Sequence, residues 1–212
     1  CGVYHFDREA VVDTSVISSM NDSMIHRGPD ESGIYIDGNV GFGHRRLSII
    51  DLARGRQPMS NEDGSIWITY NGEIYNYKTL KKALEPDQFF KTDSDSKVIL
   101  KLVEKHYRGD LADAAKQVLP QLDGVYALAL TDNRQTVIAR DRIGVRQFYY
   151  CKTDRCFAFA SEKKPLMNLN SGNEKIERLL PGHLAVFENS TMGLECFWKP
   201  ETLSERKTLI RD

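Results

Sequence analysis

The first residue of the chain, Cys1, carries two groups that could act together in a reaction. Its thiol is a nucleophile once it loses its proton, and as an N-terminal nucleophile it would also supply a free α-amine. An α-amine ordinarily has a pKa of about 7.7–8.0 and a thiol one of about 8.5, so the amine can take the thiol proton near neutral pH. Position alone leaves three interpretations open: an arbitrary boundary of the sequenced segment, a lipidated cysteine, or an N-terminal nucleophile. A lipidated cysteine is usually followed by a flexible polar tether, whereas residues 2–6 alternate as a strand does.

Five short segments have residue types that suit a binding site, but each also has an ordinary structural explanation. They are residues 27–30 (Arg-Gly-Pro-Asp), Arg46, the pair Asn71-Gly72, Asp95 and residues 141–146 (Asp-Arg-Ile-Gly-Val-Arg). Taken singly, they are explained in that order as a helix stop, a surface cation, a type I′ hairpin turn, a helix N-cap and a charged turn between strands.

Together with Cys1, these segments occur in an order that resembles one protein family. The order is Cys1-Gly2, then residues 27–30, 44–51, 71–77, 94–95, 141–146 and 159–162. It resembles the glutaminase domain of the glutamine-dependent asparagine synthetases, a class II glutamine amidotransferase with an N-terminal-nucleophile hydrolase fold. The string Asn-Gly-Glu-Ile-Tyr-Asn at residues 71–76 is similar to the asparagine-synthetase version rather than to that of the sugar-phosphate or phosphoribosyl amidotransferases. The resemblance extends to about Trp198.

The resemblance implies a role for each matching residue. Cys1 would attack the side-chain amide of L-glutamine, while Asn71 and Gly72 would form the oxyanion hole through a carboxamide and a backbone N–H. The glutamine-binding set would be Arg46, Leu47, Ile49, Ile50, Glu73 and Asp95. In that set the arginine would bind the α-carboxylate, the two acids would bind the α-ammonium, and backbone groups near the remaining three would line the site. The reaction would pass through a γ-glutamyl thioester and yield L-glutamate and ammonia.

Amide hydrolysis needs a nucleophile, a proton carrier and donors for the developing oxyanion. Because the α-amine of Cys1 serves as the proton carrier, no separate histidine base is expected, unlike in papain-like proteases. The histidines in question are His5, His26, His44, His106 and His183. The other cysteines, Cys151, Cys156 and Cys196, match no zinc-type spacing, so no metal site is expected.

The hydrophobic pattern between the motifs predicts an α+β domain. Alternating apolar residues and turn dipeptides predict short strands at residues 2–6, 33–37, 40–43, 66–70, 125–130, 136–140, 148–151, 157–160 and 184–187. Apolar residues at helical spacing predict helices over residues 14–26 and from Ser94 or Asp95 to a point before Gly109. Together with the resemblance, this pattern predicts a four-layer αββα sandwich of two mainly antiparallel sheets, of the N-terminal-nucleophile hydrolase type.

The composition favours a globular protein and gives no electrostatic reason to expect nucleic-acid or membrane binding. The chain has 29 Lys+Arg against 30 Asp+Glu, a formal net charge of −1. Its longest clean apolar run, residues 125–130, is far below the ~20 residues that a spanning helix needs. Four cysteines without a Cys-x-x-Cys pair favour a reducing compartment, so a cytoplasmic location is expected. An oligomer is compatible with the sequence, which does not specify one.

The glutaminase domain is expected to span residues 1–198, and residues 199–212 are expected to be a polar tail or linker toward a synthetase domain absent from this chain. The string nearest to the pyrophosphate loop of such a domain, Ser171-Gly172-Asn173, does not fit it. No cofactor is therefore expected in this chain: ATP and Mg²⁺ would bind only the synthetase domain, which would receive ammonia in cis or in trans. Two alternatives stay open, namely a glutaminase for a phosphoribosyl or sugar-phosphate acceptor and a non-catalytic module that retains the fold.

Two positions depart from the family pattern. Lys97 stands where an acidic residue is common, two residues after Asp95, and would either weaken glutamine binding or point to solvent. Gln147-Phe148 replaces the usual Pro-Leu, which we interpret as a variation in packing.

Overall fold

The computed structural model describes residues 1–47, 56–84, 94–169 and 174–200, and within them the strands form two six-stranded sheets. The first sheet has the order β10 (Glu177–Arg178), β8 (Tyr149–Lys152), β9 (Cys156–Ala160), β1 (Gly2–His5), β3 (Val40–Arg46), β2 (Glu31–Asp37). The second has the order β12 (Thr191–Cys196), β11 (His183–Glu188), β7 (Gln135–Arg140), β6 (Gly124–Thr131), β5 (Trp67–Ile74), β4 (Met59–Ser60). Neighbouring strands in both sheets run antiparallel.

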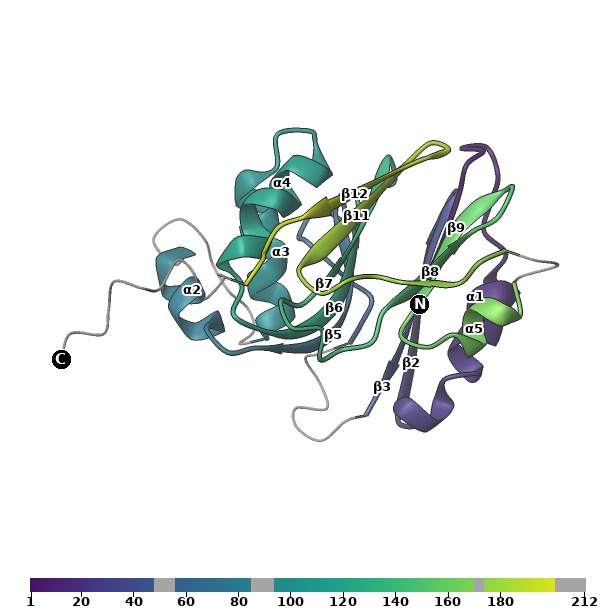
Figure 1. Ribbon diagram of the computed structural model, residues 1–212, viewed down its shortest axis with the longest axis horizontal. Coiled ribbons are helices and arrows are strands. Elements are labelled where there is room, and N and C mark those ends of the chain that lie inside the picture. The colour runs from purple at the N-terminus through teal and green to yellow at the C-terminus, as the bar shows by residue number, and fades with distance from the viewer. Residues whose placement is uncertain (48–55, 85–93, 170–173, 201–212) are drawn as a thin grey trace.

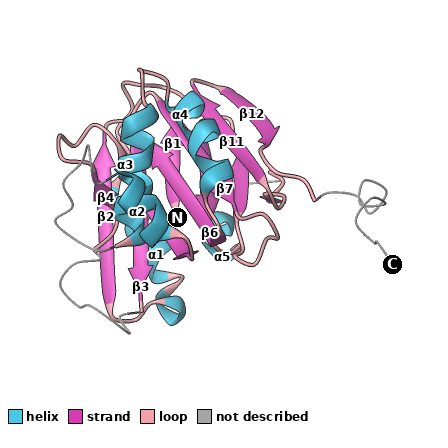
Figure 2. Ribbon diagram, turned by 90° about the vertical axis from the view of Figure 1, so that its left-hand side faces the viewer, coloured by secondary structure: helices cyan, strands magenta, loops and turns pink. Residues whose placement is uncertain are grey.

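Helices cover the outer face of each sheet, so that the molecule has four layers (Figure 1). On the first sheet lie α1 (Thr14–Asp22) and α5 (Lys164–Met167). On the second lie α2 (Tyr77–Leu84), α3 (Asp95–His106) and α4 (Leu111–Val118), which Figure 2 shows in front of the strands. This arrangement confirms the predicted α+β, four-layer αββα sandwich. Among the described residues, no helix has the length and apolar character that crossing a bilayer requires.

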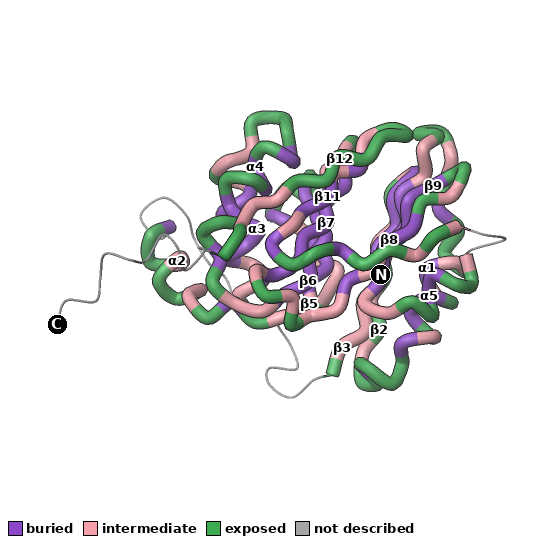
Figure 3. The backbone as a smooth tube through the Cα atoms, viewed as in Figure 1, coloured by how far each residue is buried: buried purple, intermediate pink, exposed green. Residues whose placement is uncertain are grey.

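Three apolar cores hold the layers together, one between the sheets and one under each helical layer, and Figure 3 shows the buried backbone concentrated in the strands. The central core is rich in aromatic residues: Tyr4, Phe42, Phe148, Tyr150, Phe157, Phe159 and Phe187. Strand β6 shows how an alternating sequence builds two cores at once. Its small residues Ala127 and Ala129 face the central core, whereas Leu128 and Leu130 face the helices. The small residues leave room for the rings of the opposite sheet.

The strand predictions are confirmed, and three details differ. The helix expected over residues 14–26 ends at Asp22, and residues 25–27 form a short 3-10 helix. Asn71-Gly72 is not a hairpin turn, since both residues lie inside β5. The sequence pattern also missed the helices α2, α4 and α5 and the strands β4, β10 and β12. Strand β12 has alternating apolar residues at Met192, Leu194 and Cys196, but it is mostly exposed, and its pairing with β11 defines it as a strand.

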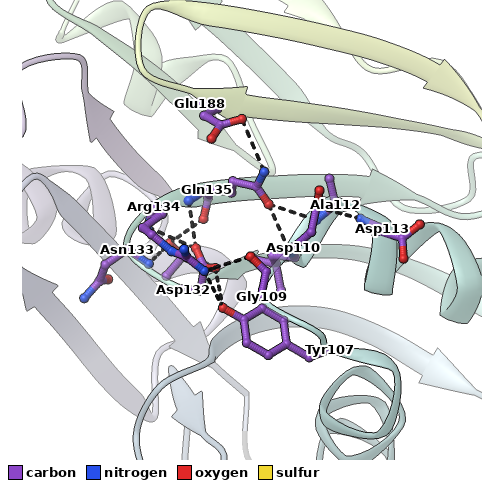
Figure 4. Close-up of polar contacts among 12 residues, drawn as sticks. Tyr107, Gly109, Asp110, Ala112, Asp113, Asp132, Asn133, Arg134, Gln135 and Glu188 are labelled. Carbon is purple, nitrogen blue, oxygen red and sulfur yellow. Dashed lines mark hydrogen bonds and ion pairs between the residues drawn. The ribbon is translucent and has the colours of Figure 1, made fainter.

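A polar cluster ties the turn between β6 and β7 to the connection between α3 and α4 (Figure 4). The side-chain oxygen of Gln135 accepts hydrogen bonds from the backbone N–H groups of Leu111 and Ala112, at 2.9 and 3.0 Å. The hydroxyl of Tyr107 donates to Asp132 at 2.8 Å. Because the first N–H groups of a helix have no partner within it, these contacts satisfy the start of α4 and orient it on the second sheet.

Residues 141–146, between β7 and β8, form a turn that the buried charged side chains of Asp141 and of the preceding Arg140 hold in place. The carboxylate of Asp141, which is 0% exposed, accepts hydrogen bonds from the backbone N–H groups of residues 126, 143, 144, 145 and 146. The neighbouring Arg140, 1% exposed, donates to the carbonyls of Gly144, Arg146 and Leu179. Each buried charge thus has several partners, as burial requires. The anchored turn leads into Phe148, which lines a cavity between the sheets.

Candidate active site

One cavity of about 670 Å³ lies where β1 and β3 of the first sheet approach β5 of the second and the start of α3. Its wall contains most of the predicted site residues: Cys1, Arg46, Leu47, Asn71, Gly72 and Asp95. Glu73 is exposed and does not belong to the wall. Ile49 and Ile50 lie outside the described residues. A cavity of this size suits a small molecule.

Cys1 is held in the cavity wall as an extension of strand β1. Its α-amine donates to the carbonyl of Gly43 at 3.0 Å, and its carbonyl accepts from the N–H of Gly43 at 2.8 Å. Its thiol donates to the side-chain oxygen of Asn21 at 3.3 Å. The following residue, Gly2, has no room for a Cβ, which would overlap with the ring of Phe159. The close packing of the sheet therefore determines where the terminal residue lies.

Burial changes the acid–base properties of this residue. Loss of hydration lowers the pKa of the Cys1 α-amine from 8.0 to about 5, because the charged form is disfavoured in the interior. At neutral pH the amine is therefore unprotonated and has a lone pair that can accept a proton. His44, which also lines the cavity, is neutral at this pH as well. Burial, together with repulsion from the α-amine and Arg46, lowers the pKa of its imidazole to about 3.

Asn71 and Gly72 lie on the part of β5 that does not pair with the edge strand β4. Strand β4 pairs only with Trp67 and Ile68, and β5 continues beyond it along the cavity. A Cβ on Gly72 would overlap with the carbonyl oxygen of Val125, so only glycine fits there. In the part of the chain that the structure describes, the carboxamide of Asn71 has no hydrogen-bond partner. The segment can therefore offer this carboxamide to a ligand in the cavity.

Two side chains brace β5 on either side of this segment. Gln57 pairs with the backbone of Tyr70 as a neighbouring strand would: its amide donates to the carbonyl at 2.9 Å, and its oxygen accepts from the N–H at 2.6 Å. Asp95 accepts from the hydroxyl of Tyr70 at 2.7 Å and from the N–H of Ile74 at 3.2 Å. Asp95 thus has a structural role in addition to facing the cavity. Gln57 was missed, since nothing in its local sequence indicates a contact with residue 70.

The cavity wall is rich in positive charge. Its arginines among the described residues are Arg27, Arg45, Arg46 and Arg146. Arg46 lies 3.0 Å from Glu31, its partner across the β2–β3 ladder. Arg27 and Arg45 also pair with carboxylates outside the wall. Since a guanidinium has five N–H donors, Arg46 can bind a second carboxylate while it keeps the first.

Lys97, the departure near Asp95, does not line the cavity. Its ammonium donates to the carbonyl of Ser60 at 3.2 Å and lies 3.3 Å from Glu62. The cation is therefore paired beside β4 instead of pointing to solvent.

The remaining cysteines do not line this cavity. Cys151 and Cys156 are buried in the core beneath α1 and α5, where burial raises the pKa of the Cys151 thiol to about 11. Cys196 is half-buried on β12. Among the residues that the structure describes, no three metal-ligating side chains gather in one place. Cys1 is thus the thiol whose surroundings suit catalysis.

Comparison with known proteins identifies the family to which this sequence is similar. The sequence matches the family described as Glutamine amidotransferase domain over residues 1–191. The glutamine-hydrolysing asparagine synthetase 1 of Bacillus subtilis (strain 168) is 43% identical over 155 residues, which cover 72% of this chain and 23% of that protein. The asparagine synthetase 1 of Lotus japonicus is 38% identical over 183 residues, covering 85% and 29%. The chain thus spans less than a third of the length of either relative.

Solved structures share the fold at lower sequence identity. The B. subtilis glutamine phosphoribosylpyrophosphate amidotransferase, complexed with ADP and GMP, superposes with a TM-score of 0.78 at 23% identity, over 94% of this chain and 50% of that one. This similarity identifies the N-terminal-nucleophile hydrolase fold. With the family match over nearly the whole sequence, it follows that the chain belongs to the class II glutamine amidotransferase domain family and is homologous to part of the glutamine-hydrolysing asparagine synthetases.

Proposed function

We propose that this domain hydrolyses L-glutamine to L-glutamate and ammonia, with Cys1 as the nucleophile. The observation that carries the proposal is the shared cavity: a thiol, an unprotonated amine and the free carboxamide of Asn71 line the same wall as Arg46 and Asp95. These are the groups that cleavage of an amide on a zwitterionic substrate needs.

The reaction would proceed by two acyl transfers. In the first, the thiol proton moves to the α-amine while sulfur bonds to the amide carbon, and the carboxamide of Asn71 and the N–H of Gly72 stabilise the oxyanion. Collapse breaks the C–N bond, and the proton on the amine passes to the leaving nitrogen, which departs as ammonia. In the second, water gives a proton to the amine and attacks the γ-glutamyl thioester, which releases glutamate and restores the thiol of Cys1.

The charged ends of glutamine would be held away from the reacting amide. Arg46 would bind the α-carboxylate with donors that do not face Glu31, and Asp95 with Glu73 would attract the α-ammonium. Backbone groups of Leu47, together with those near Ile49 and Ile50, would line this part of the site.

Ammonia release from glutamine by the purified protein tests the proposal. The parent should form glutamate and ammonia in equal amounts, and a glutamine-mimicking electrophile should label Cys1. Cys1→Ala should lose the activity, whereas Cys196→Ala, which removes a half-buried thiol bound to a backbone carbonyl, should keep it. Equal rates of ammonia release from the parent and Cys1→Ala would refute the assignment. A parent that binds no glutamine and accepts no label would instead be a non-catalytic module.

We further propose that the ammonia serves an ATP-dependent asparagine synthetase domain. The support is the activity for which the relatives are named. Because this chain covers less than a third of their length, the synthetase domain would lie in the part of those proteins that this chain does not match. The complete product of the source gene, supplied with aspartate, ATP, Mg²⁺ and glutamine labelled with ¹⁵N in its amide, should form ¹⁵N-asparagine. Glutamate without labelled asparagine would assign the ammonia to another acceptor, such as a phosphoribosyl or sugar-phosphate compound.

A further inference from the structure

Asn21, near the end of α1, is in direct contact with the thiol of Cys1. Its side chain is 0% exposed, and its oxygen accepts from the thiol at 3.3 Å. Its amide nitrogen donates to the hydroxyl of Ser32 at 3.2 Å and to the carbonyl of Gly33 at 3.1 Å. No motif singled out in the sequence includes this residue.

The hydrogen bonds determine which end of the carboxamide faces the thiol. The carbonyl of Gly33 can only accept, so the NH₂ group of Asn21 must point to it, and the oxygen is left to face Cys1. An amide oxygen can accept a hydrogen bond but carries no proton to donate. It therefore favours the S–H form over the thiolate, whose charge its lone pairs would repel.

Close packing of α1 on β3 holds this contact in place. A Cβ added to Gly43 would lie 2.6 Å from the Asn21 oxygen and 2.8 Å from the Cys1 sulfur, so both atoms lie directly against the strand. The guanidinium of Arg45 donates to the backbone carbonyl of Asn21 at 3.2 Å and to the side chain of Asp22 at 2.8 Å. These bonds connect the end of the helix to the same strand. Neither the helix nor the thiol can shift without breaking these contacts.

We propose that Asn21 is a positioning residue, which keeps Cys1 protonated and its sulfur oriented until the substrate arrives and the α-amine takes the proton. The inference deepens the proposed function and rests on it for the identity of the substrate. In the resting protein the S–H bond is intact and points at the Asn21 oxygen. On reaction the S–H bond breaks, an N–H bond forms at the α-amine, and the amide oxygen is left without its donor. Because the thiolate is the reactive form, the resting thiol is protected from oxidants and alkylating agents.

The pH dependence of Cys1 alkylation by iodoacetamide, followed on the N-terminal peptide by mass spectrometry, tests this role without glutamine. Asn21→Ala removes the acceptor, so the midpoint pH of alkylation should fall by about half to one unit. Asn21→Asp places a carboxylate against the sulfur and should raise it. Ser32→Ala, which alters a partner of Asn21 on the side away from the thiol, is the matched control and should leave the midpoint in place. The other charged or titratable groups lining the cavity stay unchanged: the α-amine, Arg27, His44, Arg45, Arg46, Tyr70, Asp95 and Arg146.

Kinetics separate this inference from the proposed function. With glutamine, Asn21→Ala should lose about tenfold to a hundredfold in kcat, with little change in KM because Asn21 holds the nucleophile and not the charged groups of the substrate.

If the alkylation midpoints of both variants equal that of the parent while glutamine is still hydrolysed, Asn21 is merely structural and this inference fails while the proposed function stands. If the midpoints move in opposite directions but no variant or parent hydrolyses glutamine, the positioning role stands and the substrate assignment fails. Should Asn21→Ala unfold, Asn21→Asp carries the test, and an unmoved midpoint in it overturns the proposal.

Discussion

The acid limb of the glutaminase pH profile should lie near pH 5, because the proposed general base is the buried α-amine of Cys1. Burial lowers the pKa of this amine from 8.0 to about 5. Only the unprotonated amine can accept the thiol proton, so kcat/KM should be constant above the pKa and fall tenfold per unit below it. At pH 7 the unprotonated fraction is about 99% for a pKa of 5 but only about 9% for a pKa of 8. The buried position is therefore worth about a tenfold gain at neutral pH.

The assay is initial-rate ammonia release at low glutamine from pH 4.5 to 9, with circular dichroism at each pH to show that the protein stays folded. The imidazole of His44 has its pKa lowered to about 3, so it does not titrate in this range, and His44→Gln should keep the same midpoint. A variant with one additional residue before Cys1 converts the amine into an amide and should lose about 10²-fold or more of the rate. An acid limb near pH 8 in the folded parent would refute the proposed effect of burial on the amine.

Three further outcomes follow from the contacts around the cavity. Gly72→Ala should lower the free energy of unfolding by about 1–3 kcal/mol and reduce glutaminase activity, since its Cβ would overlap with the carbonyl of Val125; chemical denaturation measures the first effect. Asp141→Ala should destabilise the fold by about 3–5 kcal/mol, seen as a lower Tm, because it leaves the five backbone N–H groups that donate to Asp141 without their acceptor. Asp95→Asn should raise KM for glutamine about tenfold with little change in Tm, since an amide oxygen can still accept from β5 but the charge is lost.

Matched variants separate these effects from general damage. Gly193→Ala adds a Cβ with nothing within 4 Å and should be neutral, so equal losses in Gly193→Ala and Gly72→Ala would contradict the packing explanation. Asp154 is exposed, and Asp154→Ala should leave Tm unchanged. Tyr70→Phe removes a tie to Asp95 but no charge; if it raised KM as much as Asp95→Asn, the negative charge would not be what binds the substrate.

Local sequence patterns were sufficient for most of the fold. The strands predicted at residues 33–37 and 40–43 are present and pair with each other as the hairpin of β2 and β3. The sequence pattern gave a wrong prediction where a short segment is compatible with two local structures. Asn71-Gly72 is a common hairpin turn, yet in this protein it continues a strand, because β6 pairs with β5 throughout and Gln57 extends the pairing on the other side. Pairing between distant segments overrode the local preference.

The sequence alone determined the inventory of reactive groups: a terminal cysteine, an arginine, an acid and an Asn-Gly pair, in an order similar to one family. Tertiary structure decided their states. Whether the Cys1 amine is protonated depends on its loss of water between packed sheets, and no feature of residues 1–6 encodes that. Whether its thiol meets Asn21 depends on a helix lying against glycines of β3. Desolvation and side-chain orientation are properties of contacts between segments distant in the chain, which is why they appear only once the chain is folded.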